Sequence, residues 1–86
     1  MYRISYEKRV LKDLDKIPNA DGERINEVFK ELSLNPTPAG YKKLSGGADL
    51  FRVRQGDYRI VYTIDRKEKK VAIILVRHRK EAYRQL

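Results

Sequence analysis

The chain contains no cysteine and no tryptophan, and it has a single histidine. The absence of cysteine excludes disulfide bonds and thiolate metal sites, and it is typical of proteins in a reducing cytoplasm. One histidine is too few for a usual zinc site, which takes several His or Cys ligands. A nuclease that uses two histidines as its acid and base is excluded for the same reason. We therefore expect a cytoplasmic protein without a metal or another cofactor.

Long apolar segments are also absent. The longest apolar run covers residues 71–76, whereas a membrane-spanning helix needs about 20 residues. The first six residues, Met-Tyr-Arg-Ile-Ser-Tyr, lack the apolar centre of a signal peptide. Of the 86 residues, 41% are hydrophobic and 37% are charged, which is typical of a globular protein. We expect one domain over residues 1–86 and no membrane partner.

Positive charge is concentrated in the C-terminal part. Residues 1–34 contain seven Lys/Arg and seven Asp/Glu, whereas residues 35–86 contain thirteen Lys/Arg and five Asp/Glu and carry the net charge of +8. Much of the excess is arginine at short spacings, in Arg52-x-Arg54, at Arg59 and in Arg77-His78-Arg79. The guanidinium group presents a planar set of donors that matches phosphate oxygens. Charge alone leaves two interpretations, a phosphodiester or nucleic-acid site and a solvated basic face.

Apolar periodicity predicts the elements of the N-terminal part. Residues 2–6 alternate as a strand with one buried face. Helical spacing follows in Val10, Leu11, Leu14 and Ile17 and ends near Pro18. After a turn at residues 19–22, a second helix with a clean apolar stripe over residues 25–32 ends at Asn35-Pro36. Residues 35–49 contain several Pro and Gly residues and are expected to form a loop that carries Lys42 and Lys43.

The C-terminal part has the period of two that is typical of strands. Apolar residues alternate with polar or basic ones over residues 51–54 and 58–64. A two-residue turn at Gly56-Asp57 predicts a hairpin, with the pairs Gln55–Tyr58, Arg54–Arg59, Val53–Ile60, Arg52–Val61 and Phe51–Tyr62. In that register the apolar residues share one face, and Arg52, Arg54 and Arg59 share the other. The run 71–76 predicts a strand buried on both faces.

Arg54 and Arg59 are expected to face each other across the hairpin. Like charges in that position repel and destabilise a sheet by a fraction of a kcal/mol. The pair is explained if an anion normally binds there. The other interpretation is that both side chains extend into solvent.

Together, these elements predict an α+β fold. An N-terminal strand and a helical hairpin precede a three-strand antiparallel meander, which forms one small sheet with the helices on one face, and a short C-terminal helix or tail follows. The motifs are Leu44-(x)7-Arg52-x-Arg54, Gly56-x-Tyr58-Arg59-Ile60-Val61-Tyr62 and Val76-x-His78-Arg79-(x)3-Tyr83. With them the chain resembles the RelE/ParE toxin superfamily over about residues 2–83, and within it the RelE-type mRNA interferases of type II toxin–antitoxin pairs. The central motif also occurs in ParE-like members, so the His-Arg…Tyr ending adds specificity.

The resemblance implies a small antiparallel sheet whose basic concave face enters the ribosomal A site and cleaves mRNA there. The functional residues of RelE-type members fall here on Arg52, Arg54, Arg59, Arg79 and Tyr83. The first two positions are more familiar as lysines. Arginine keeps the charge but does not release a proton, so these two residues suit electrostatic binding of the RNA backbone and not a lysine-based proton transfer.

The implied reaction is metal-free attack of the mRNA 2′-OH on the adjacent phosphate, which leaves a cyclic phosphate and a 5′-OH. We expect Arg59 and Arg79 to hold the phosphate and its developing charge. Tyr83 is a candidate base because arginines around it favour the phenolate, and its other interpretation is a stacking platform or tail anchor. His78 is a candidate acid or a structural neighbour of Arg79. Lys42, Lys43 and Arg77 are expected to contact RNA, or to serve solubility alone.

Such a toxin implies a cognate antitoxin, RelB-like or other, that folds on binding, besides the ribosome and mRNA. A ParE-like inhibitor of DNA gyrase is the main alternative, and it would not need the His-Arg…Tyr ending. A plain RNA-binding module would expose aromatic residues on the sheet, whereas those of this chain alternate inward. A stand-alone nuclease would need a strong general base, which the sequence does not offer.

Overall fold

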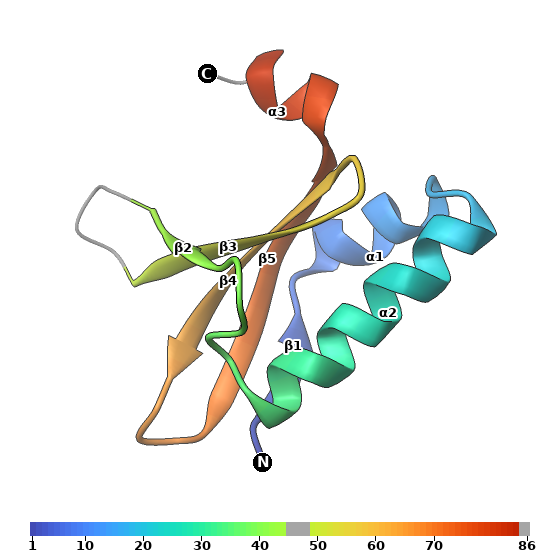
Figure 1. Ribbon diagram of the computed structural model, residues 1–86. Helices are drawn as coiled ribbons and strands as arrows, with labels where there is room; N and C mark the ends of the chain where they lie inside the picture. Colours follow the sequence, from blue (N-terminus) through green and yellow to red (C-terminus); the bar gives the residue numbers. More distant parts are fainter. Residues whose placement is uncertain (45–48, 85–86) are drawn as a thin grey trace.

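A mixed sheet with helices on one side forms the body of the molecule (Figure 1). The computed structural model describes residues 1–44 and 49–84, the last three as backbone only. The order along the chain is β1 (Arg3–Tyr6), α1 (Lys8–Asp15), α2 (Asn19–Leu34), β2 (Lys42–Lys43), β3 (Leu50–Gln55), β4 (Tyr58–Asp65), β5 (Lys70–His78) and α3 (Arg79–Arg84). Among the helices that the structure describes, none combines the length and hydropathy of a membrane-spanning segment.

The strand order in space is β1-β5-β4-β3-β2. β1 runs parallel to β5, and the other neighbouring strands are antiparallel. Parallel neighbours need a long crossover connection, which here includes α1 and α2. The sheet is thus mixed, which corrects the purely antiparallel sheet implied by the resemblance. The meander β3-β4-β5 and the helices on one face are confirmed.

The two predicted helices are present with a different boundary between them. α1 ends at Asp15, and α2 begins at Asn19, directly after Pro18. Proline suits the start of a helix because its missing N–H would have no partner there. The prediction of a separate turn over residues 19–22 is therefore wrong, since these residues form the first turn of α2. Leu11, assigned to the apolar stripe of α1, is 55% exposed.

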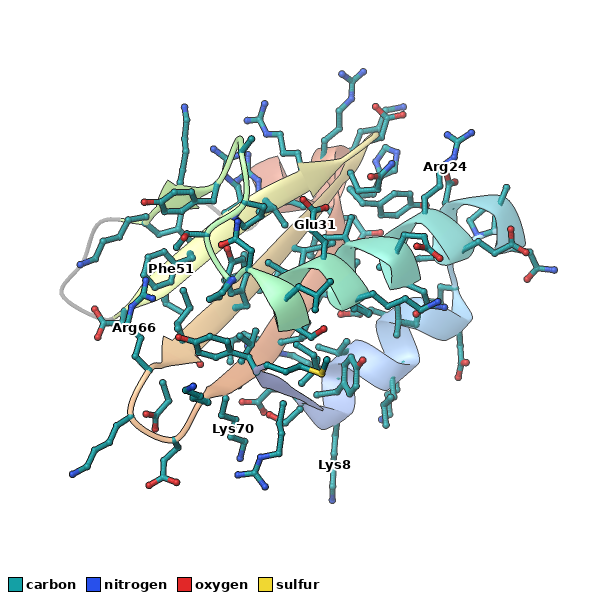
Figure 2. All side chains as sticks on the ribbon, turned by 60° about the horizontal axis from the view of Figure 1, so that its bottom comes forward. Lys8, Arg24, Glu31, Phe51, Arg66 and Lys70 are labelled. Atoms are coloured by element: carbon teal, nitrogen blue, oxygen red, sulfur yellow. The ribbon has the colours of Figure 1, made fainter. Side chains whose placement is uncertain are left out.

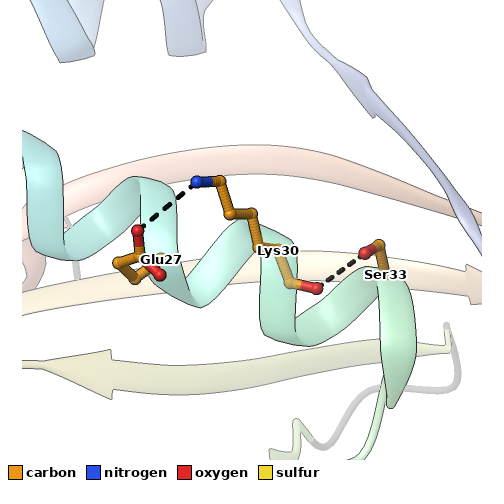
Figure 3. Close-up of polar contacts among 3 residues, drawn as sticks. All are labelled: Glu27, Lys30 and Ser33. Atoms are coloured by element: carbon orange, nitrogen blue, oxygen red, sulfur yellow. Dashed lines mark hydrogen bonds and ion pairs between the residues drawn. The ribbon is translucent and has the colours of Figure 1, made fainter.

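The core lies between the helices and one face of the sheet. The fully or nearly fully buried residues are Val10, Ile25, Phe29, Leu32, Val53, Ile60, Tyr62, Val71, Ile73 and Val76. The Tyr62 hydroxyl donates a hydrogen bond to the Pro36 carbonyl oxygen at 2.7 Å, which ties the chain after α2 to the sheet. The outer face of α2 is solvated, and there Lys30 Nζ lies 3.4 Å from Glu27 Oε1 (Figure 3).

The segment between α2 and β3 contains a strand that the sequence did not predict. Lys42 and Lys43 pair with Arg52 and Phe51 of β3, so the prediction of a loop over residues 35–49 is wrong at these two positions. The loop residues Pro36, Pro38 and Gly40 all precede residue 42. The backbone N–H groups from residue 42 onward are therefore able to pair with a neighbouring strand. β2 covers the outer edge of β3, which would otherwise be exposed.

A β-bulge decides which side chains of β5 face the core. Val61 pairs with Leu75 while Tyr62 pairs with Ile73, so Ile74 is an extra residue in β5. The bulge shifts the alternation of side chains by one position. Arg9 Nε donates a hydrogen bond to the Ile74 carbonyl oxygen at 2.9 Å. The beginning of α1 thus provides a donor to the edge of β5 beyond the end of β1.

Candidate functional site

Three arginines form a row across β3, β4 and β5. Arg54 pairs with Arg59, and Arg59 pairs with Arg77. The pairing of β3 with β4 is the register predicted from the Gly56-Asp57 turn. Val76, next to Arg77, faces the core, so the row lies on the face of the sheet opposite the core.

A small hollow lies at the hairpin end of this row. Its volume is about 140 Å³, and its lining residues are Arg54, Gly56, Asp57, Tyr58, Arg59 and Arg79. Gly56 has a φ of 58°, a left-handed conformation that glycine adopts without steric cost. This turn leads β3 directly back into β4 and so places Arg54 beside Arg59. The three guanidinium groups suit a phosphate group as ligand.

Arg79 reaches the hollow from a separate element. β5 ends at His78, and α3 begins at Arg79, next to the β3–β4 turn (Figure 1). The Arg79 backbone N–H donates to the Asp57 carbonyl oxygen at 2.7 Å. Arg79 Nε lies 3.8 Å from Asp57 Oδ1, with the two side chains 66% and 64% exposed. An ion pair in such solvent contributes less than about 1 kcal/mol, so the backbone hydrogen bond fixes α3 and the guanidinium can turn toward an anion.

Arg77 has a different environment. Its Nη1 forms an ion pair with Asp13 Oδ1 of α1, with the two side chains 16% and 14% exposed. Arg77 does not line the hollow. Asp13 Oδ2 is buried and has no hydrogen-bond partner in the described part of the chain. Arg77 thus connects the end of the arginine row to α1.

The basic residues nearer β2 also lie outside the hollow. Arg52 is 6% exposed and lies between Lys42 and Val61 in the cross-strand row next to the three arginines. Lys42 and Lys43 are exposed on β2, and Lys43 Nζ lies 3.6 Å from Asp49 Oδ1. The structure thus brings Arg54, Arg59 and Arg79 together and separates Arg52, Lys42 and Lys43 from them.

His78 does not line the hollow, and it pairs with Tyr58 across β4 and β5. Its position one residue from Arg77 places it on the other side of the sheet from the arginine row. Its ring packs edge-on against Tyr58, with the ring centroids 5.3 Å apart and an interplanar angle of 90°. The Lys80 backbone N–H donates to His78 Nδ1 at 3.3 Å. Tyr83 lies on α3, and its side chain is outside the described residues.

Three residues of the hollow, Gly56, Asp57 and Tyr58, were not predicted as part of a site. Gly56 and Asp57 were assigned to the turn. Tyr58 was assigned to the core by its apolar parity, and it does pack against the core. Burial raises the pKa of Tyr58, and the carboxylates of Asp21, Asp57 and Glu81 raise it further. The signal for Asp57 was its place in the turn between the strands that carry Arg54 and Arg59, which brings it to the hairpin end of the arginine row.

Some basic residues lie at the opposite end of the sheet from this hollow. Arg66 and Lys70 lie at the β4–β5 turn, away from the β3–β4 turn (Figure 2). Among the described residues there is no cluster of three or more His, Cys, Asp or Glu that would hold a metal ion.

Comparisons with known proteins place the chain in a family. The family model described as ParE toxin of type II toxin-antitoxin system, parDE, matches residues 4–83. RelE1 of Methanocaldococcus jannaschii is 30% identical over 86 residues, which cover 96% of each chain. Toxin RelG of Mycobacterium tuberculosis is 32% identical over 84 residues, which cover 96% of this chain and 97% of the relative.

Solved structures agree with this relationship. The archaeal RelE in a RelE–RelB complex from Pyrococcus horikoshii has a TM-score of 0.82 and 35% identity, covering 91% of this chain and 94% of that one. The isolated E. coli RelE toxin has a TM-score of 0.79, covers 99% of this chain and 98% of that one, and at 22% identity supports the fold alone. The chain belongs to the RelE/ParE superfamily of toxins from type II toxin–antitoxin systems.

Proposed function

We propose that the protein is a ribosome-dependent endoribonuclease that cleaves mRNA in the A site and so inhibits translation. The observation that carries the proposal is the hollow in which Arg54, Arg59 and Arg79 meet from three different elements. Such a set of fixed donors suits a phosphate whose negative charge increases during the reaction. The relatives named RelE and RelG support the same choice within the superfamily.

The proposed reaction is attack of the 2′-OH on the adjacent phosphate without a metal ion. Arg59 and Arg79 hold the phosphate oxygens, and Arg54 holds the approaching backbone. Tyr83 and His78 exchange protons with the reacting oxygens. Arg52, Lys42 and Lys43 supply positive charge along the path of the RNA, and the ion-paired Arg77 supports Arg59 from the end of the row. The ribosome contributes the orientation of the scissile bond.

We further propose a cytoplasmic protein held inactive by a cognate antitoxin. Several of the similar solved structures are toxins bound to RelB-type antitoxins. A net charge of +8 suits a partner segment that is acidic and folds on binding.

Inhibition of DNA gyrase is the alternative, since the matching family model is described by its ParE members. The two functions separate in one pair of assays. We expect the protein to stop a cell-free translation reaction and to shorten its mRNA, while gyrase supercoiling continues. Loss of supercoiling with intact mRNA would establish the alternative.

A further inference from the structure

The proposed reaction needs a group that accepts the 2′-OH proton, and the hollow contains few candidates. Its lining includes three arginines, Asp57 and Tyr58 as ionisable residues. Arginine stays protonated at any usual pH. Tyr58 also keeps its proton, because its pKa is raised. Among the described lining residues, Asp57 is the one with a carboxylate, a group that serves as a general base in enzymes.

The position of Asp57 fits this task. Its carboxylate is 64% exposed, and Oδ1 lies 3.8 Å from Arg79 Nε. Arg54 of β3, Arg59 of β4 and Arg79 of α3 line the same hollow, so a phosphate bound by them lies beside this carboxylate. The Arg79 N–H donates to the Asp57 main-chain oxygen, which fixes the turn without using the side chain.

We infer that Asp57 is the general base that activates the 2′-OH; the inference rests on the proposed function. The O2′–H proton moves to the Asp57 carboxylate, and the O2′ electron pair forms the new bond to phosphorus. The P–O5′ bond breaks, and the 5′-oxygen takes a proton from Tyr83 or His78. The products are the cyclic phosphate and the 5′-OH. Asp57 then returns its proton to water, and the acid takes one back from water.

The test is single-turnover cleavage on programmed ribosomes by Asp57→Asn and Asp57→Ala. Asn keeps the size and turn preference of Asp, and circular dichroism verifies the fold of both variants. We expect the rate to fall by about 100-fold or more in each. The matched control, Asp15→Asn, changes an exposed aspartate of α1 and should cleave at the parent rate.

Added carboxylates separate a base from a residue that only holds Arg79. If Asp57 accepts the proton, formate and acetate should restore cleavage by Asp57→Ala, and acetate, the stronger base, should restore more at equal concentration. A parent rate in Asp57→Asn would overturn the inference, and so would a slow Asp57→Ala that neither anion restores. If Asp57→Asn fails to cleave and the parent is active, the proposed function is retained. If the parent itself does not cleave, both the proposed function and the inference about Asp57 are overturned.

Discussion

The arginines that meet at the β3–β4 hairpin have different surroundings, and each environment predicts a different effect of substitution. Arg59 and Arg79 line the hollow and do not belong to the hydrophobic core. Arg77 belongs to a largely buried ion pair. Loss of function without loss of stability is therefore expected at Arg59 and Arg79, and loss of stability at Arg77.

Arg59→Ala and Arg79→Ala should each abolish growth inhibition on expression, because each removes donors directed at the phosphate. Circular dichroism and thermal melting should show a folded protein in both cases. Arg66→Ala, at the β4–β5 turn (Figure 2), is the matched control and should remain toxic. Unchanged toxicity in both hollow variants would refute the assignment of the site.

Tyr83→Phe tests whether the phenol transfers a proton. The substitution keeps the aromatic face and removes the hydroxyl, so we expect single-turnover cleavage on the ribosome to fall by about two orders of magnitude while binding barely changes. The opposite pattern, with Phe close to the parent and Ala impaired, would identify Tyr83 as a stacking residue. His78 would then be the remaining donor for the 5′-oxygen.

Tyr62→Phe should lower stability in a pH-dependent way. Burial, and then the nearby Tyr41, raises the pKa of Tyr62 from 10.0 to about 12. The folded state keeps a proton that the unfolded state loses near pH 10, so this stabilisation is complete below pH 10 and is lost as the pH rises to about 12. The variant loses the hydrogen bond to Pro36, and urea denaturation at pH 7 should show a loss of about 1–2 kcal/mol.

Between pH 10 and 12 the parent should lose more stability than Tyr62→Phe. Tyr2→Phe is the control, because Tyr2 is only partly buried beside the core. This variant should retain the steep loss of stability at alkaline pH. Equal alkaline slopes for the parent and Tyr62→Phe would show that Tyr62 does not carry this effect.

At the scale of elements, the β3–β4 hairpin and the β5 strand were predictable, and the bulge within β5 was not. A two-residue turn at Gly56-Asp57 allows one pairing of the flanking residues, and that pairing also puts Val53 with Ile60 and Phe51 with Tyr62 on one face. In the run 71–76 both the odd and the even positions are apolar. The pattern therefore cannot indicate that Ile74 is an extra residue at a bulge. Without that bulge, Arg77 would share the face of Val71 and Ile73. Its place in the arginine row follows from packing between strands and not from the local sequence.

The remaining errors have similar causes. The pairing of Lys42 and Lys43 depends on the edge of β3, which is distant in the sequence. α2 starts directly after Pro18, although Asn19, Asp21 and Gly22 have a preference for turns. The role of Asp57 was hidden because a turn explains aspartate without a site.

The attachment of α1 to β5 should depend on Asp13. Asp13→Asn removes the charge that pairs with Arg77 and leaves a largely buried guanidinium with a weaker partner. We expect the free energy of unfolding to fall by about 2–3 kcal/mol, below the range for fully buried pairs because some solvent reaches this one. Asp15→Asn in the same helix should change it by less than about 0.5 kcal/mol. A double variant with Arg77→Met should lose less than the sum of the two single changes, and simple additivity would show that the pair does not couple α1 to the sheet.

At the scale of the whole molecule, a neutral helical layer supports a strongly basic sheet. β1, α1 and α2 lie within residues 1–34, which have no net charge, and residues 35–86 carry +8. The hollow is small and open to solvent at Arg54 and Asp57, so it suits one phosphodiester group and provides few contacts to the rest of an RNA chain. We therefore attribute the positioning of the substrate to the ribosome.

Cleavage of one mRNA, free in solution and placed in the ribosomal A site, tests this claim most directly. A third sample carries a single 2′-deoxynucleotide at the cleavage position. We predict rapid cleavage in the A site that leaves a 2′,3′-cyclic phosphate and a 5′-OH, almost none of the free mRNA, and none at the 2′-deoxy position. Equal cleavage of free and ribosome-bound mRNA, or cleavage at the 2′-deoxy position, would contradict the account.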